Sequence, residues 1–170
     1  HLHNIHFHLT SAVLHVLQKF QIPTVMTLHD YALLAPNMTL SCRGGICPHV
    51  REGSTFQWRC LFHGCYDRSF LKTAVAGLDQ WWSLTRSDAY DHVSKFIAPS
   101  TFIRDAFCRH GWSADRFEVI PHFLPSVTIP PVEAQRDIDV LFVGRLTEGK
   151  GVRVLLKPLA GLPLKSVIVG

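Results

Sequence analysis

The sequence predicts an α/β protein built on parallel sheets. Short apolar segments alternate with segments of helical periodicity along most of the chain, which is typical of βαβ units. The runs VLFV and SVIV, residues 140–143 and 166–169, are almost entirely apolar, as expected of parallel strands that are buried on both faces. The 170 residues, 47% of them hydrophobic, are enough for one domain and part of a second.

The first elements are predicted from periodicity and from helix-capping residues. Residues 1–9 read as the end of a strand and its loop. Thr10 or Ser11 is suited to cap a helix that runs to about Phe20. Its apolar face at i, i+3, i+4 and i+7 would consist of Val13, Val16, Leu17 and Phe20. The β-rich run 24–28 is the next expected strand.

The middle of the chain combines a long insertion with two capped helices. Residues 35–68 are rich in Gly, Pro and Cys, which predicts an irregular insertion. Ser69 is expected to cap a helix to about His92, and Ser100 a helix that ends at Gly111. The apolar face of the longer helix would consist of Leu71, Ala74, Val75, Leu78, Trp82 and Leu84. Strands are expected at residues 95–99 and 117–120.

Proline marks a boundary before the last elements. Four prolines and no periodicity predict a linker at 121–137, between a domain at 1–120 and the start of another at 138–170. A strand at 139–143, a helix at 152–156 that Pro158 ends or bends, and a strand at 167–169 should follow.

The bulk charge excludes some classes of function. The formal net charge of +4, from 17 Lys and Arg against 13 Asp and Glu, is mild, and the basic residues form no dense run. We therefore expect no nucleic-acid partner. No apolar run reaches about 18 residues, so no membrane-spanning helix is predicted.

The stretch Val140 to Val152, VLFVGRLTEGKGV, has the pattern of a strand, a loop and a helix start. The N-terminus of a helix offers unpaired N–H groups and a positive dipole end, which suit a phosphate. Arg145 and Lys150 add two cations, and Gly144 supplies the turn. The alternative is an ordinary connection with solvated cations. The glycine spacing matches neither a P-loop nor GxGxxG.

His29 is a candidate functional residue because it follows the 24–28 strand, at the edge where ligands of parallel sheets bind. A structural role is the commoner outcome for a lone histidine. Asp30 could fix the ring's tautomer or cap a turn. The histidines of the first nine residues have no Cys or carboxylate between them, which favours a loop edge near a site over a metal cluster.

Four cysteines are spaced C-x4-C-x12-C-x4-C, at Cys42, Cys47, Cys60 and Cys65. The short spacings lie at the edge of the range for structural zinc, and two disulfides would require an oxidising compartment. Reduced, buried thiols are the favoured interpretation, with zinc as the alternative. Cys108, on an expected helix, reads as a small core residue.

The order of these motifs resembles that of family 4 glycosyltransferases. The segments that carry the resemblance are TLHDYALLAPN, FIAPSTF and VGRLTEGKG, and the cysteine-bearing insertion resembles that of members that assemble polysaccharides. The resemblance implies a GT-B fold, with Rossmann-like parallel sheets and helices on both faces. The chain would hold the latter part of the N-terminal, acceptor-side domain and the start of the C-terminal, donor-binding domain.

The resemblance also implies roles for particular residues. Arg145 and Lys150 match the pair that grips the diphosphate of a nucleotide-sugar donor, Gly144 the turn beside it, and His29 the histidine near the donor sugar. The acceptor would be a glycan or a lipid-linked glycan, the reaction would retain anomeric configuration, and catalysis would need no metal. The family implies a cytoplasmic enzyme, at the inner face of the membrane when it makes peripheral contact.

The motifs that are missing relative to this family predict an incomplete enzyme, and two other functions were considered. The later acidic E-x7-E motif and the first glycine-rich loop of such enzymes are missing, so an interior fragment that is inactive alone is expected. The main alternative function is a binding or structural module stapled by zinc in the Cys42–Cys65 insertion. A phosphate-binding epimerase or kinase-like domain is disfavoured, because the sequence has neither a Tyr-x-x-x-Lys pair nor a P-loop.

Overall fold

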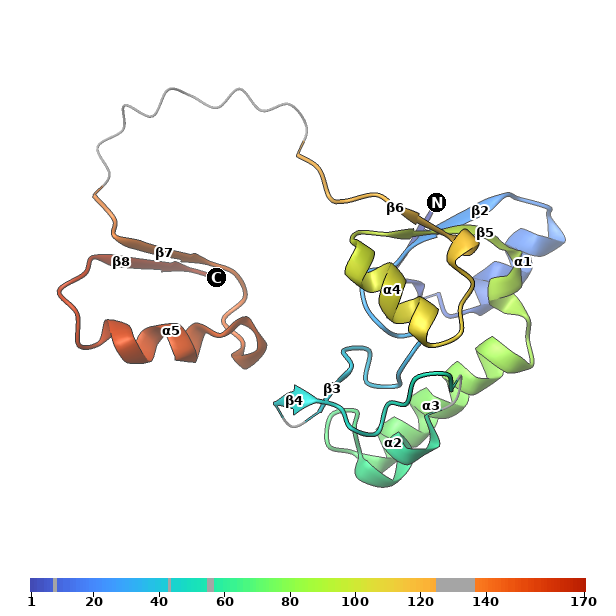
Figure 1. Cartoon of the computed structure of the whole chain (residues 1–170), viewed down its shortest axis with the longest axis horizontal. Coiled ribbons are helices and arrows are strands. Elements are labelled where there is room, and N and C mark those ends of the chain that lie inside the picture. Colours follow the sequence, from blue (N-terminus) through green and yellow to red (C-terminus); the bar gives the residue numbers. More distant parts are fainter. Residues whose placement is uncertain (8, 43, 55–56, 125–136) are drawn as a thin grey trace. The chain divides into compact units, whose positions relative to one another are not determined.

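The computed structural model describes residues 1–7, 9–42, 44–54, 57–124 and 137–170. The chain separates into two compact units, His1–Phe123 (unit 1) and Leu124–Gly170 (unit 2), which are described separately (Figure 1). Most of the linker predicted at 121–137 lies outside the described residues. Within the described residues, no helix is long and apolar enough to cross a membrane.

Unit 1 is built on a four-stranded sheet whose strands are all parallel, in the spatial order β1-β2-β5-β6. These strands are β1 (Leu2–His3), β2 (Thr24–Thr27), β5 (Val93–Ala98) and β6 (Phe117–Val119). Helices flank the sheet, so the predicted α/β class with parallel strands is confirmed (Figure 1). The sheet is compatible with a Rossmann-like arrangement.

The helical segments of unit 1 follow the chain between these strands. They are η1 (Ile5–Phe7), α1 (Ala12–Lys19), α2 (Trp58–His63), α3 (Phe70–Thr85), η2 (Ala89–His92), α4 (Thr101–Arg109) and η3 (Ala114–Arg116), where η marks a 3-10 helix. Two predicted caps are confirmed, because Ser69 Oγ accepts from the Lys72 amide and Ser100 Oγ from the Ile103 amide, both at 3.3 Å.

The core of unit 1 lies between the sheet and its helices. Phe96 and Phe107 are fully buried in it, and their rings contact Trp112 edge-on, with centroids at 5.3 and 5.6 Å. The Arg116 guanidinium covers the Phe96 ring at 5.1 Å, which closes one end of this aromatic cluster.

The predicted face of α1 is only partly correct. Val13 and Leu17 are half-buried, and Val13 packs against the core. The fully buried residue is Leu14, however, and Val16 and Phe20 are exposed. Ser11 occupies the N-cap position without a capping bond, because its hydroxyl bonds instead to Ser83 Oγ at 2.8 Å. A tertiary partner has therefore replaced the local cap.

The predicted end of the long helix and most of its predicted face are wrong, although Leu84 packs against the core as predicted. α3 ends at Thr85, because the Ser87 hydroxyl bonds back to the Ser83 carbonyl and Asp88 turns left-handed before η2 begins. The helix buries Thr73, Gly77, Gln80 and Ser83. Four residues of the predicted face are instead 55–76% exposed, namely Leu71, Val75, Leu78 and Trp82.

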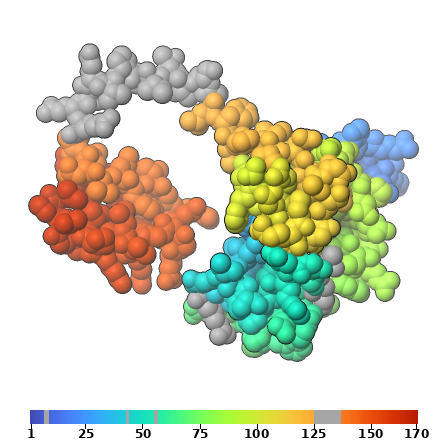
Figure 2. Space-filling view, viewed as in Figure 1, coloured from blue at the N-terminus to red at the C-terminus, as the bar shows by residue number. Residues whose placement is uncertain are grey.

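The insertion at 35–68 is more regular than predicted. It contains α2 and a short antiparallel hairpin, β3 (Ser41–Cys42) with β4 (Gly45–Ile46). Figure 2 shows it as a cyan lobe against the yellow α4 region. The Gly53 amide donates to the Arg109 carbonyl at 3.2 Å, and Glu52 pairs with the Arg109 side chain at 3.0 Å, which ties the lobe to α4.

Unit 2 is a single βαβ unit. It consists of β7 (Val140–Val143), η4 (Glu148–Lys150), α5 (Val152–Leu159) and β8 (Ser166–Val169), with the two strands parallel. The predicted strand–loop–helix–strand order is confirmed, and α5 ends one residue after Pro158. The prediction that these strands are buried on both faces is wrong for β7, because Leu141 and Val143 are 60% and 71% exposed.

Candidate functional site

The predicted phosphate-binding loop lies at the carboxyl end of β7. Gly144 follows the strand with a φ of 154°, which side chains disfavour, and its amide donates to the Val169 carbonyl at 2.9 Å. The carboxyl ends of β7 and β8 therefore meet beside the loop, at the edge where ligands of parallel sheets bind. Arg145 and Lys150 are both exposed next to this edge.

The rest of the loop delivers the chain to the N-terminus of α5. Glu148–Lys150 form the 3-10 turn η4, and Gly151 then adopts a left-handed conformation with a φ of 75°. The first amides of α5 follow directly, so one segment holds a helix N-terminus and two cations. Glu148 lies in the same turn and lowers the segment's net charge to +1.

His29 lies at the carboxyl edge of the sheet of unit 1, beyond β2, as the sequence predicted. Its Nε2 lies 2.8 Å from Nδ1 of His3, at the end of β1. On its other side, the His122 ring stacks with it at 6.1 Å between centroids, with 13° between the ring planes. This edge therefore gathers histidines from three separate strand ends.

The His3–His29 contact joins two ring nitrogens. One ring nitrogen donates in this contact and the other accepts. Both side chains are exposed, and they border a hollow of about 370 Å³. Its other lining residues are His1, Thr27, Ile97, Ile120, Pro121, His122 and Phe123. Apolar walls with a few convergent polar groups are typical of a small-molecule site.

Asp30 caps a turn. Its Oδ1 accepts from the Ala32 amide at 2.9 Å, an Asx-type bond that turns the chain after β2. The Tyr31 amide then donates to the Met38 carbonyl at 2.9 Å, and the Tyr31 carbonyl accepts from the Leu34 amide at 2.8 Å. The segment after His29 is thus a closed, hydrogen-bonded loop. Of the two roles considered for Asp30, the structure supports the cap.

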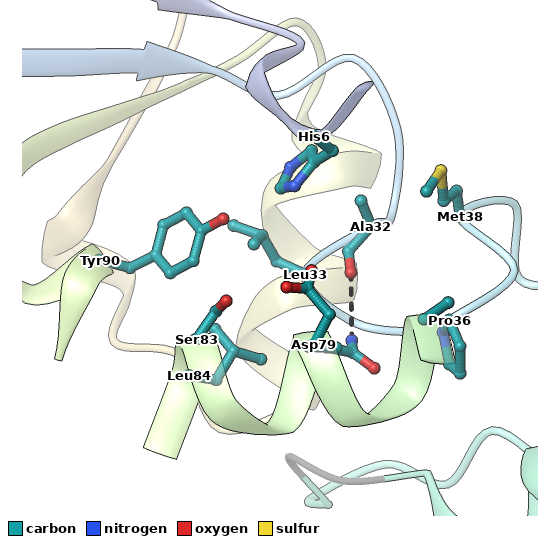
Figure 3. A pocket seen from close by; sticks show the side chains of 11 residues that line it. His6, Ala32, Leu33, Pro36, Met38, Asp79, Ser83, Leu84 and Tyr90 are labelled. Carbon is teal, nitrogen blue, oxygen red and sulfur yellow. Dashed lines mark hydrogen bonds between the residues drawn. The ribbon is translucent and has the colours of Figure 1, made fainter. Parts of the chain in front are cut away.

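A second, smaller pocket of about 60 Å³ lies between α3 and the loops that follow β1 and β2 (Figure 3). His6, Asp79, Ser83 and Tyr90 line it (Figure 3). At its edge, the Gln80 amide donates to the Ala32 carbonyl at 3.1 Å. This pocket was not predicted from the sequence. The signal that could have revealed it is the polar series on α3 that the apolar pattern concealed.

Burial and charge perturb two groups in this pocket. Burial lowers the pKa of His6, and the nearby Asp30 and Asp79 carboxylates partly oppose that shift. Burial, with the same two carboxylates, raises the pKa of Tyr90. His6 is therefore held toward its neutral form and Tyr90 firmly in its protonated form.

The four clustered cysteines meet inside the insertion as free thiols. The sulfurs of Cys42, Cys47 and Cys65 all lie within 4.8 Å of one another, and Cys47 Sγ lies 3.7 Å from Cys65 Sγ. Cys60 is fully buried beside them and interacts with the other three thiols. Burial raises the pKa of the Cys60 thiol to about 12. Cys108 is separate, on α4.

The predicted site residues therefore fall in two places: His29 lies in unit 1, and Gly144, Arg145 and Lys150 lie together in unit 2. No family model, curated protein or solved structure matches the chain.

Proposed function

We propose that this chain is part of a GT-B glycosyltransferase, with unit 1 in the acceptor-side domain and unit 2 in the donor-binding domain. The parent protein transfers a sugar from a nucleotide-sugar donor to a glycan or lipid-linked acceptor, with retention of anomeric configuration. The observation that carries the proposal is the Gly144–Gly151 loop, which places Arg145, Lys150 and a helix N-terminus at the carboxyl end of a parallel strand. His29, at the same kind of edge in unit 1, adds support.

The chemistry of the reaction fits these residues. The bond between the anomeric carbon and the diphosphate oxygen breaks, and the diphosphate leaves with the electron pair. An acceptor hydroxyl oxygen bonds to that carbon and releases its proton. Arg145, Lys150 and the first amides of α5 stabilise the negative charge that develops on the diphosphate, so we expect no metal requirement in catalysis. The His29 ring, paired with His3, offers a hydrogen bond to a sugar hydroxyl.

The binding half of the proposal is testable on the 170-residue chain. We expect it to bind a nucleoside diphosphate, with Arg145→Ala and Lys150→Ala each weakening the affinity about 10- to 100-fold, the value of a hydrogen bond to a charged group. Lys157→Ala, in the last turn of α5, is the matched control and should bind like the wild type. Isothermal titration calorimetry measures all four proteins. Equal affinity in all of them, or no binding by any, contradicts the proposal.

The catalytic half requires the parent protein. His29→Ala should lower kcat for sugar transfer while leaving nucleoside diphosphate affinity unchanged, because His29 and the donor loop lie in different units. An unchanged kcat would show that His29 has no role in the reaction.

Cytoplasmic location at the inner face of a membrane, with peripheral contact, belongs to the same proposal. The exposed apolar side chains of α3 are compatible with such contact.

A further inference from the structure

The four insertion cysteines are brought together by two different local structures. Cys42 ends β3, and Cys47 follows β4 after the hairpin turns the chain. Cys60 lies within α2, and Cys65 follows the left-handed Gly64 that caps this helix. Two segments separated by twelve residues of sequence therefore contribute one pair of thiols each. Pairs of cysteines on a hairpin and at a helix end are a common way to assemble a structural metal site.

The sulfur spacing matches the geometry of a tetrahedral thiolate centre. Zinc–sulfur bonds of about 2.3 Å place neighbouring sulfurs of a regular tetrahedron about 3.8 Å apart. Cys47 and Cys65 have their sulfurs 3.7 Å apart, and Cys42 completes a triangle with every edge within 4.8 Å. A disulfide would bring two sulfurs to about 2 Å. The arrangement is thus too wide for a disulfide and close to the spacing for a shared metal ion.

The buried apolar cluster of the insertion is small among the residues that the structure describes there. Its buried cluster consists of Cys47, Cys60 and Cys65, with Cys42 and Val50 packed against it. Three of its large apolar side chains are 50–91% exposed, namely Ile46, Trp58 and Phe62. A segment with so small a buried cluster gains stability from a staple such as a disulfide or a metal.

The charge of the segment suits a dianionic centre. A divalent ion with four thiolates carries a net charge of −2. Residues 35–68 contain four arginines, at positions 43, 51, 59 and 68, against two carboxylates, Glu52 and Asp67. The resulting formal charge of +2 balances such a centre.

We propose that Cys42, Cys47, Cys60 and Cys65 bind one Zn²⁺ ion that staples the insertion. Four thiolates fill the tetrahedral coordination of zinc and leave no open position, so the role is structural and not catalytic. Soft thiolate ligands favour zinc over Mg²⁺ or Ca²⁺. Each thiol gives up its proton on binding, so the metal takes the place of four S–H protons, three of them on buried cysteines. The inference is independent of the proposed glycosyl transfer.

Metal content of the purified chain is the first test. Protein prepared under reducing conditions should contain about one zinc per chain by mass spectrometry, and Cys60→Ala should contain none. Cys108→Ser is the matched control, since this cysteine lies on α4, and it should retain the full equivalent. Iron in place of zinc, no stoichiometric metal in the wild type, or a full equivalent in Cys60→Ala overturns the proposal.

Reconstitution separates loss of a ligand from loss of the fold. Wild-type chain stripped of metal should bind one equivalent of Co²⁺ and develop the intense visible bands of tetrahedral cobalt with thiolate charge transfer. Cys42→His, at the most exposed of the four positions, keeps four ligands, so it should still bind one equivalent with weaker charge transfer. Octahedral cobalt spectra, or a Cys42→His spectrum identical to that of the wild type, contradict the assignment.

Discussion

The Thr73 side chain joins the end of the insertion to the start of α3 by hydrogen bonds. A substitution by valine removes its hydroxyl and keeps the shape of the side chain. Thr73 is fully buried, and its Oγ1 accepts from the Tyr66 amide at 2.9 Å and donates to the Ser69 carbonyl at 2.6 Å. Thr85, in the same helix, is exposed and bonds only within the helix, to the Trp81 carbonyl at 2.6 Å. The substitution Thr→Val at these two positions therefore forms a matched pair.

The two substitutions should differ in stability because only Thr73→Val leaves a hydrogen-bond donor without its acceptor. Valine keeps the β-branched shape and nearly the same helix propensity, so those contributions cancel within the pair. Thr73→Val leaves the Tyr66 amide without its acceptor, which should cost about 1–3 kcal/mol of the free energy of unfolding. Thr85→Val should change it by less than about 0.5 kcal/mol. At an unfolding entropy of about 2.1 cal/mol/K per residue, Thr73→Val lowers the Tm of a unit the size of unit 1 by about 4–12 °C.

Urea unfolding followed by tryptophan fluorescence measures both variants. All four tryptophans, at positions 58, 81, 82 and 112, lie in unit 1, so the signal reports that unit alone. The slope of unfolding free energy against urea should match the wild type in both variants, because the surface exposed on unfolding is unchanged. Equal stability of Thr73→Val and Thr85→Val would refute the role assigned to the Thr73 hydroxyl.

Three further predictions concern other parts of the chain. In the same unfolding assay, Leu78→Ala should lower the free energy of unfolding by less than about 0.5 kcal/mol and Leu14→Ala by about 2–5 kcal/mol, because of the two only Leu14 is buried. Equal losses would mean that α3 buries the face that carries Leu78. Because burial lowers the pKa of His6, the unfolded chain binds the proton more readily than the folded chain does, so the free energy of unfolding should fall as the pH drops from about 6.5. His6→Gln should make that decline less steep. Parallel curves of unfolding free energy against pH for the variant and the wild type would contradict this prediction. Gly151→Ala forces a side chain to a φ of 75°, so it should destabilise unit 2 by about 1–2 kcal/mol; unchanged hydrogen-exchange protection of the β7 and β8 amides would contradict the conformation.

Local sequence signals predicted the elements well, because strands and caps depend on neighbouring residues. The runs around Val25 and Phe96 are short, β-rich and bounded by turns, and both are central strands. Ser69 and Ser100 precede helical segments and act as N-caps. Gly111 follows α4 with a φ of 90°, as expected for the residue after a helix.

Helix orientation was not predictable, because it depends on partners far away in sequence. The buried polar residues of α3 each bond to a different segment: Thr73 to Tyr66, Gln80 to the Ala32 carbonyl and Ser83 to Ser11. These bonds compensate the cost of burying polar groups, so the helix presents its polar face inward. An apolar stripe on a helix predicts its buried side only when such partners are absent.

The candidate site divides along the same line. The loop at Arg145 and Lys150 was predictable because a strand, a turn and a helix start are local features. The residues that contact His29 were not predictable, because His3 and His122 come from strand ends 26 and 93 residues away in sequence. The cysteine spacing left three states open, because the convergence of Cys42 and Cys65 depends on a hairpin and a helix packing together.

Three separate hydrogen bonds close the segment that runs from the His29 edge to the cysteine cluster. The Tyr31 amide donates to Met38, the Asn37 side chain donates to the Ser41 carbonyl at 2.8 Å, and the Cys47 amide donates to the Leu40 carbonyl at 2.8 Å. Asn37 is buried, so its bond is protected from water. The loop that begins two residues after His29 is therefore closed at its far end by the hairpin that holds the first cysteine pair. Loss of the staple should loosen this loop before it disturbs the sheet, because β2 is held independently by its pairing with β1 and β5.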